Sequence, residues 1–176
     1  MRGLLIRAAW LVALVLMTPV SARADATVLV GGTSVAALRP SYGFSFGYRP
    51  SAVGFEIEYL STTPGDYTAG GIFASLFVQP VTISTVQIFA VGGVGAWGEG
   101  FAGGKRTGVL GAGNVGGGVL VPLAGPVSLR LDYRLFLLGE VSKEEIGAIA
   151  PRTNHPQRIA AGILSLIHIS EPTRPY

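Results

Sequence analysis

The fold of this chain is decided by residues 111–138, GAGNVGGGVLVPLAGPVSLRLDYRLFLL. From Val127 to Leu137 an apolar residue or a tyrosine stands at every second position, and the positions between them carry three charges. Successive side chains of a β-strand point to opposite faces of the sheet, so this period of two predicts a strand with one apolar and one charged face. Its eleven residues match the roughly 9–11 that a tilted transmembrane strand needs. The apolar face is therefore expected to meet either a protein core or lipid.

The N-terminal segment, residues 1–24, has the composition of a secretory signal peptide. Arg2 and Arg7 supply a basic start, residues 8–20 are predominantly apolar, and Ala22-Arg23-Ala24 is a small-x-small cleavage site. A transmembrane anchor is the alternative, but about twenty apolar residues would be needed to span a bilayer as a helix. We expect export with cleavage of this segment, and a folded unit of residues 25–163.

The C-terminal segment resembles a sequence that is foreign to the rest of the chain. Residues 164–175, LSLIHISEPTRP, resemble the in-frame translation of a transposase adapter used in sequencing libraries. The resemblance implies that residues 164–176 are a non-native tail and that the last strand is truncated. Residues 164–170 are nevertheless apolar enough to complete a strand, so we expect a closed structure but poor assembly in a membrane.

Charge and composition exclude several classes of function. Residues 25–163 hold nine basic and nine acidic residues, so the folded unit is neutral and offers no argument for nucleic-acid binding. The chain has no cysteine, and its stability therefore has to come from its backbone ladder and packing instead of disulfides. Its 26 glycines show no collagen period and lie within apolar alternating runs, which indicates strands that pack closely.

The same alternation predicts seven more strands, at residues 27–35, 42–48, 53–60, 69–79, 86–97, 108–121 and from 158 onward. We expect Pro80 to end the fourth strand, because proline cannot donate to the ladder. A bulge at Gly92-Gly93 in the fifth strand would leave the face of Trp97 undefined. Eight strands without an intervening helix pattern predict an all-β, eight-stranded, antiparallel up-and-down barrel.

The connections favour a membrane barrel over a soluble one. Those after the second, fourth and sixth strands are short, whereas those after the third, fifth and seventh grow to nine and eighteen residues; the short connection after the first strand departs from this pattern. Outer-membrane barrels have short periplasmic turns and longer external loops. Tyr42, Tyr48 and Tyr59 lie on apolar faces near strand ends, where aromatic girdle residues are found. The alternative is a soluble, periplasmic lipocalin-like barrel, with the apolar residues pointing inward around a ligand and the strand charges in water.

Charged residues within the strands share one parity. Glu56 and Glu58 on the third strand, and Arg130, Asp132 and Arg134 on the seventh, all alternate with apolar residues. The third and seventh strands lie opposite each other in a ring of eight, and the interior of such a ring is only wide enough for side chains to fill it. The sequence therefore predicts a structural network of these five charges across the lumen, because unpaired buried ions would cost several kcal/mol each.

Three segments resemble those of a known group of proteins. Gly113–Gly118 followed by Leu129–Arg134 resembles the penultimate hairpin of small bacterial outer-membrane β-barrels of the OmpA-like and OmpW-like group. Gly54–Tyr59 resembles their third strand, and Arg158–Ile163 the start of their last. The resemblance implies an outer-membrane location, contact with outer-membrane lipid and insertion by the barrel-assembly machinery. Members of the group usually end in an aromatic residue that this machinery reads, and here residues 164–176 replace that end.

No catalytic, cofactor or metal site is expected. His155 is the only histidine of residues 25–163, whereas a metal site needs several clustered ligands and the lipid A-modifying barrels have a matching serine. Gly111–Gly118 lacks the Lys-Ser/Thr and the helix of a phosphate loop, and Glu144-Glu145 beside Lys143 is expected in a solvated loop. We expect a monomeric envelope protein with a structural or surface-interaction role. The alternatives are a narrow porin-like channel for small solutes and the lipocalin-like barrel.

Overall fold

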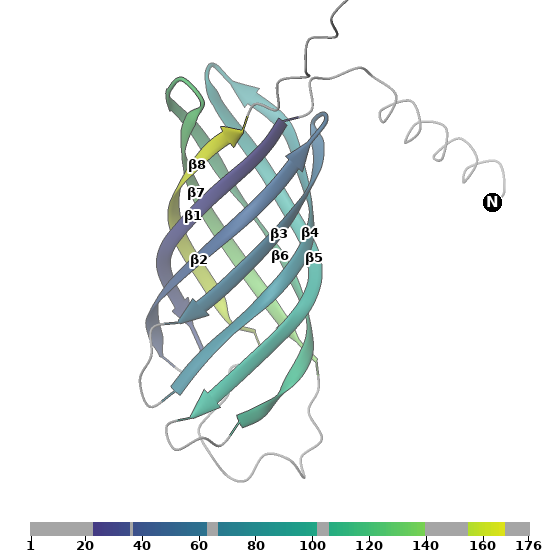
Figure 1. Cartoon of the computed structure of the whole chain (residues 1–176), viewed down its shortest axis with the longest axis vertical. Helices are drawn as coiled ribbons and strands as arrows, with labels where there is room; N and C mark the ends of the chain where they lie inside the picture. Colours follow the sequence, from purple (N-terminus) through teal and green to yellow (C-terminus); the bar gives the residue numbers. More distant parts are fainter. Residues whose placement is uncertain (1–22, 36, 63–66, 102–105, 140–154, 168–176) are drawn as a thin grey trace, which may run out of the picture.

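A computed structural model describes residues 23–35, 37–62, 67–101, 106–139 and 155–167. It contains eight strands, β1 (Arg23–Ser34), β2 (Leu38–Arg49), β3 (Val53–Thr62), β4 (Tyr67–Ile83), β5 (Val86–Phe101), β6 (Arg106–Ala124), β7 (Val127–Leu138) and β8 (Gln157–Ile167). Each strand pairs antiparallel with the next in sequence, and β8 pairs with β1 to close the ring (Figure 1). The predicted eight-stranded up-and-down barrel is confirmed.

The alternation of side chains is inverted relative to a soluble protein. Apolar side chains cover the outside of the wall, as on β3, where Phe55 and Ile57 are 58% and 60% exposed. Glu56 and Glu58, between and after them, are 2% and 0% exposed and point into the lumen. On β7 the predicted faces are also observed, with Leu131, Tyr133 and Leu137 outside and Arg130, Asp132, Arg134 and Phe136 buried inside. Burial in this molecule therefore means enclosure by the ring.

The two ends of the barrel differ in their connections. The turn end carries the tight turns at residues 50–52, 84–85 and 125–126, together with the start of β1 and the end of β8 (Figure 1). The second of these turns has Ser84 and the third has Gly125 at positive φ. At the loop end, only the connection from β7 to β8 is long, because β5 and β6 extend through most of the loop predicted at residues 99–107. The predicted asymmetry therefore depends chiefly on one connection.

Two expectations for β4 and β5 are wrong. Pro80 does not end β4, because a bulge between Val78 and Val81 takes up one extra residue and places the proline, which lacks an N–H, where the ladder is interrupted. Gly92-Gly93 holds no bulge, since its pairing with β4 and β6 is continuous. The parity of β5 therefore runs unbroken to Trp97, which is fully buried in the lumen. A register shift lies between Trp97 and Glu99 instead.

The predicted end segments overlap the barrel at both seams. β1 begins at Arg23, two residues before the predicted folded unit, and β8 includes residues 164–167 of the predicted tail. Leu164 is buried in the lumen, as expected if apolar tail residues complete the last strand. The remainder of both segments, and Lys143, Glu144 and Glu145, lie outside the described residues. Within the part of the chain that the structure describes, no helix is long and apolar enough to cross a membrane.

The lumen is filled in layers. An apolar cluster at the loop end contains Val35, Leu60, Ala69, Phe73, Trp97, Ala112 and Phe136. A second cluster nearer the turn end contains Phe77, Phe89, Val91, Leu120 and Leu164. Glycines on neighbouring strands make room for the larger side chains. A Cβ on Gly95 would lie 2.7 Å from Phe73 Cδ1, and one on Gly116 would lie 3.0 Å from Arg134 Cγ. The charged side chains of β3 and β7 lie between the two apolar clusters.

Candidate functional site

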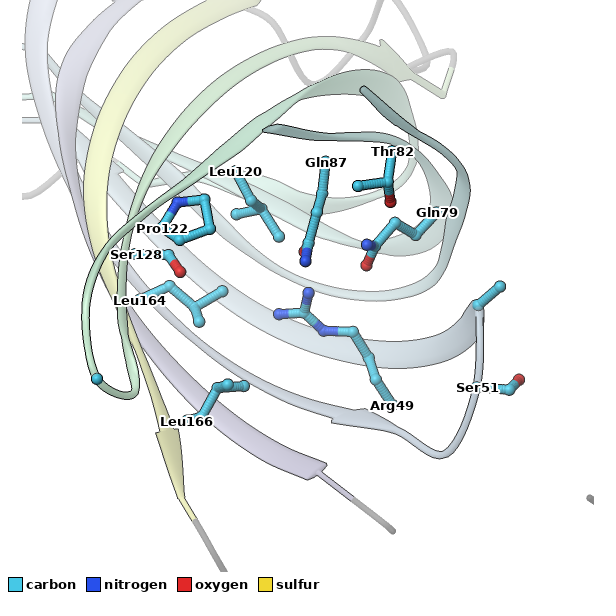
Figure 2. Close-up of a pocket in the computed structure, with 12 residues that line it drawn as sticks. Arg49, Ser51, Gln79, Thr82, Gln87, Leu120, Pro122, Ser128, Leu164 and Leu166 are labelled. Atoms are coloured by element: carbon cyan, nitrogen blue, oxygen red, sulfur yellow. The ribbon is translucent and has the colours of Figure 1, made fainter. Parts of the chain in front are cut away.

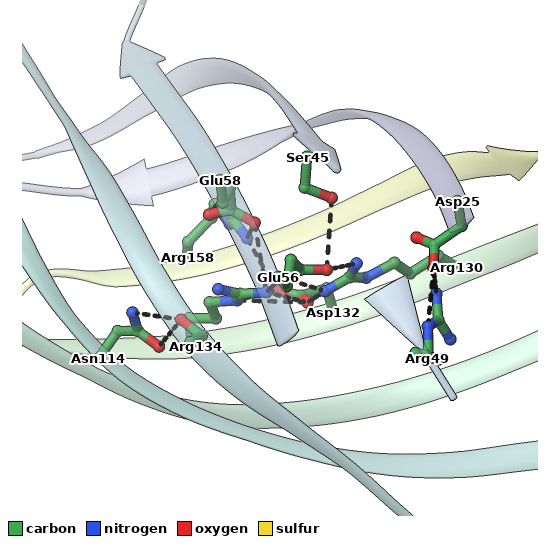
Figure 3. A network of polar contacts seen from close by, with 11 residues as sticks. Asp25, Ser45, Arg49, Glu56, Glu58, Asn114, Arg130, Asp132, Arg134 and Arg158 are labelled. Carbon is green, nitrogen blue, oxygen red and sulfur yellow. Dashed lines mark hydrogen bonds and ion pairs between the residues drawn. The ribbon is translucent and has the colours of Figure 1, made fainter. Parts of the chain in front are cut away.

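All five charged residues that the sequence places in the lumen lie together in one cluster (Figure 3). β3 supplies the two glutamates and β7 supplies Arg130, Asp132 and Arg134. Because β3 and β7 occupy opposite sides of the ring, the contacts cross the lumen instead of following one sheet face. Arg130 and Arg134 are both fully buried, and each keeps one nitrogen, Nε and Nη1 respectively, without a hydrogen bond to a described residue.

Glu56 lies between the two arginines of β7. Arg130 donates to both of its oxygens, through Nη1 to Oε2 and through Nη2 to Oε1 at 3.2 Å. Arg134 donates to Oε1 through Nη2. Ser45 on β2 adds a neutral hydrogen bond to Oε2 at 3.3 Å. Bidentate contact of this kind combines charge with the planar geometry of the guanidinium, which makes it one of the stronger pairings available to a buried carboxylate.

Asp132 connects the arginines to one another. Its Oδ2 lies 2.7 Å from Arg130 Nη2, and its Oδ1 lies 3.2 Å from Arg134 Nε. The residues are two positions apart on β7, so their side chains point to the same face of the strand. Asp132 therefore holds both guanidinium groups in place toward Glu56.

A sixth charge, Arg158 on β8, completes the cluster and was not predicted. Arg158 binds Glu58 bidentately, at 2.7 Å and 3.0 Å, and contacts Asp132 Oδ1 at 2.9 Å. Two signals in the sequence point to it. Arg158 has the opposite parity to the exterior residues Ile159 and Ile163, and five lumen charges with three acids require one more base. These six residues are called the ionic layer below.

A second ion pair, the mouth pair, lies closer to the turn end and was also missed. Asp25 Oδ2 accepts a hydrogen bond from Arg49 Nε at 2.8 Å, and Arg49 Nη2 lies 2.7 Å from the same oxygen. Residue 25 was expected to precede the first strand and residue 49 to lie in a turn, whereas both lie within strands. Their parity would have identified them had the strand ends been placed correctly.

Aromatic rings border the charges on both sides. The guanidinium carbon of Arg130 lies 4.9 Å from the centre of the Phe89 ring, and that of Arg158 lies 6.0 Å from the centre of the Phe136 ring. Phe136 also packs against Phe73 and Trp97 at the loop end, with ring centres 5.0 Å and 5.3 Å apart. Guanidinium groups are attracted to aromatic faces, so these rings stabilise the cations while excluding water.

Chemically, the arrangement is suited to stabilisation more than to turnover. In the ionic layer each carboxylate oxygen is contacted by an arginine nitrogen, which leaves no carboxylate free to move a proton. Among the described residues, no group of three or more histidine, aspartate or glutamate side chains is arranged to hold a metal ion. His155 is exposed just before β8, and the residues 111–118 are part of strand β6.

Comparisons with solved structures find the same architecture. The crystal structure of Neisserial surface protein A matches with a TM-score of 0.64 and 20% identity, over 82% of this chain and 96% of that one. A major outer membrane protein of Thermus thermophilus matches with a TM-score of 0.60 and 9% identity, over 84% and 100%. The N-terminal β-barrel domain of Pseudomonas aeruginosa OprF matches with a TM-score of 0.59 and 11% identity, over 81% and 97%.

Sequence comparisons add nothing to these matches, since neither a family model nor a curated protein matches the chain. At 9–20% identity the structural matches establish the fold alone. That fold agrees with the exterior apolar wall and the enclosed charges described above. By its fold, the chain is a small, closed, eight-stranded antiparallel barrel, the architecture that these three outer-membrane proteins also have.

Proposed function

We propose that this protein resides in the bacterial outer membrane as a structural or surface-interacting barrel, with no catalytic activity. The observation that carries the proposal is the inverted wall, which is apolar outside and charged inside. A transmembrane barrel needs an outward-facing apolar band, because lipid cannot hydrate polar groups. In the proposed orientation the turn end faces the periplasm and the loop end faces the cell exterior.

The ionic layer has a structural role in this proposal. Its six groups connect β3 with β7 and β8 across the lumen, and they are balanced as three acids and three bases. A closed ring has to satisfy its interior polar groups internally, and removing one partner of a buried ion pair typically costs about 3–5 kcal/mol. The cluster therefore braces opposite walls of the barrel between its two apolar clusters.

The alternative of a narrow channel is less well supported. Between the two mouths of the lumen lie the loop-end aromatic cluster and then the ionic layer, whose described side chains are at most 3% exposed. A conducting path would have to displace both. The lipocalin-like alternative requires apolar side chains around a central ligand and charges in water, which is the reverse of the observed arrangement.

Cell fractionation tests the location. The full chain, expressed with residues 1–24 in a Gram-negative host, is expected in the outer-membrane fraction in small amounts, with slower gel mobility after heating as the barrel unfolds. A second variant, ending after Ile167 with one added phenylalanine, restores an aromatic end and is expected to assemble in larger amounts. Recovery of both forms in the soluble periplasmic extract would contradict the proposal, and stepwise conductance in planar bilayers would favour the channel instead.

A further inference from the structure

The lumen contains a hollow at the turn end that the structural role does not use. This cavity has a volume of about 620 Å3 and lies between the mouth pair and the turns (Figure 2). Its wall is divided by chemistry. Leu120, together with Leu164 of the predicted non-native tail, forms part of an apolar side, whereas five residues supply polar groups: Arg49, Gln79, Thr82, Gln87 and Ser128. The strands β2, β4, β5 and β7 all contribute to this polar set.

The guanidinium group of Arg49 is held along one edge by Asp25 and against one face by Phe77. Asp25 holds its Nε and lies close to Nη2, and the guanidinium carbon lies 4.3 Å from the centre of the Phe77 ring. The side chain is 10% exposed. Its Nη1 makes no hydrogen bond or ion pair with any residue that the structure describes, and Figure 2 shows the guanidinium directed toward the middle of the cavity. A guanidinium has five N–H donors in a planar fork, so one held carboxylate leaves donors for a second.

Two glutamine amides face Arg49 across the hollow. Figure 2 shows the side chains of Gln79 and Gln87 extending toward the guanidinium. Neither amide is hydrogen-bonded to a described residue. The bulge in β4 has a part in this arrangement, because its extra residue allows Gln79 and Thr82 both to face the lumen while Val81 and Ile83 stay on the apolar exterior. A bulge that re-aims side chains into a cavity is a common feature next to binding sites.

We propose that this cavity binds a small carboxylate that also carries an amide or hydroxyl group. The carboxylate lies against the free edge of Arg49, and the amides of Gln79 and Gln87 supply the donors and acceptors that the rest of the ligand needs. Because Asp25 already balances the charge of Arg49, each bound carboxylate adds one net negative charge to the cavity, and the ligand is therefore expected to carry a single carboxylate held by directed hydrogen bonds. Its opening toward the periplasm rests on the orientation proposed above, whereas the binding itself does not.

The test uses the full chain refolded in lipid nanodiscs and labelled with 15N. N-acetylglycine, which has one carboxylate and one amide, is the probe, and N-acetylglycinamide is the matched neutral compound. Saturable shifts are expected in the side-chain signals of Gln79, Gln87 and Arg49 with N-acetylglycine, and roughly tenfold weaker binding with the neutral compound, as for loss of a charge-assisted hydrogen bond. The absence of saturable shifts, or equal affinity for both compounds, would overturn the proposal.

Variants separate recognition from folding. Asp25→Asn combined with Arg49→Gln removes both charges without leaving one buried alone, and it is expected to weaken N-acetylglycine binding about tenfold or more. Gln87→Leu leaves the mouth pair intact and is expected to weaken N-acetylglycine binding several-fold. Gln157→Leu makes the same change at the opposite end of the barrel and should leave affinity unchanged. Heat-modifiable mobility verifies that each variant is folded, and folded variants that all bind like the parent would refute the site.

Discussion

The ionic layer and the mouth pair are both built from arginine and carboxylate, yet they differ in completeness. The difference concerns the carboxylates: in the ionic layer both oxygens of Glu56, Glu58 and Asp132 contact a guanidinium nitrogen, although three guanidinium nitrogens there make no hydrogen bond to a described residue, Nε of Arg130 and Arg158 and Nη1 of Arg134. In the mouth pair, Asp25 Oδ2 is engaged, whereas its Oδ1 has no partner among the described residues. The difference follows from position. At the middle of the lumen each carboxylate lies between two or three arginines, whereas at the turn end Asp25 pairs with Arg49, and its Oδ1 is buried outside the lining of the cavity.

The comparison predicts its largest effect at Arg134, which contacts all three acids of the ionic layer. Arg134→Met keeps much of the side-chain volume but leaves excess negative charge enclosed. We expect a loss of about 3–5 kcal/mol in the free energy of unfolding. Urea unfolding in lipid vesicles, followed by heat-modifiable mobility, measures it. A loss below about 1 kcal/mol, the usual worth of a solvated ion pair, would mean that water reaches the layer.

Lysine substitutions on the exterior wall should lower the free energy of unfolding somewhat less, by an amount that depends on the position along the barrel axis. Ile57 lies in the middle of β3 and Leu38 at the loop end of β2, and both are exposed on the outside. Ile57→Lys is expected to cost about 2–4 kcal/mol in a bilayer, and Leu38→Lys about 0–1 kcal/mol. The same unfolding experiment in vesicles compares them. Equal costs at the two positions would argue against a lipid-facing belt.

Packing inside the wall is tested by a pair of glycines. A Cβ at Gly95 would meet the Ile72 carbonyl oxygen at 2.1 Å and Phe73, whereas a Cβ at Gly111 would meet nothing within 4 Å. Gly95→Ala is therefore expected to destabilise by about 1–3 kcal/mol. Gly111→Ala is the matched control and should change the midpoint of unfolding little. Similar stability of the two variants would show that the wall relaxes around Phe73 freely.

The mouth pair should give the smallest effect when both partners are removed. Asp25→Asn with Arg49→Gln leaves no unpaired ion, and replacement of a whole buried pair is often close to neutral. We expect the double variant to lie within about 1 kcal/mol of the parent, and Arg49→Gln alone to be less stable than the double variant. A thermodynamic cycle of the two single variants and the double variant gives the coupling. A double variant as unstable as Arg134→Met would remove the distinction between the two regions.

The strands, and which of their side chains face the lumen, could be predicted because a barrel wall with an apolar exterior and a charged interior imposes a strict period of two on the sequence. Val127–Leu137 indicated both β7 and its lumen charges, and Gly54–Tyr59 did the same for β3. The positions of strand ends were less predictable, because the ladder continues through residues that usually interrupt it. Pro80 stays within β4 since a bulge needs no donor there, and Glu99 stays within β5 despite the glycines around it.

Residues of the site could be predicted only within strands whose bounds were predicted correctly. Arg158 was overlooked although its parity and the unbalanced charge both indicated it, and Asp25 and Arg49 were lost with the strand ends. The cavity could not be predicted, because it depends on which side chains leave space at the turn end and on the bulge that turns Gln79 and Thr82 inward. Such a shape arises from packing across strands that are distant in sequence.

The position of Arg158 on the last strand bears on how the ring is formed. A sheet of β1 to β7 would bring together three carboxylates and only two guanidinium groups, and Glu58 would keep only its 3.3 Å contact with Arg134. β8 supplies the missing cation, Arg158, and its pairing with β1 also closes the barrel. The interior charges therefore balance only when β8 is in place. A sheet that lacks β8 keeps one surplus negative charge, and this charge imbalance favours closure of the barrel.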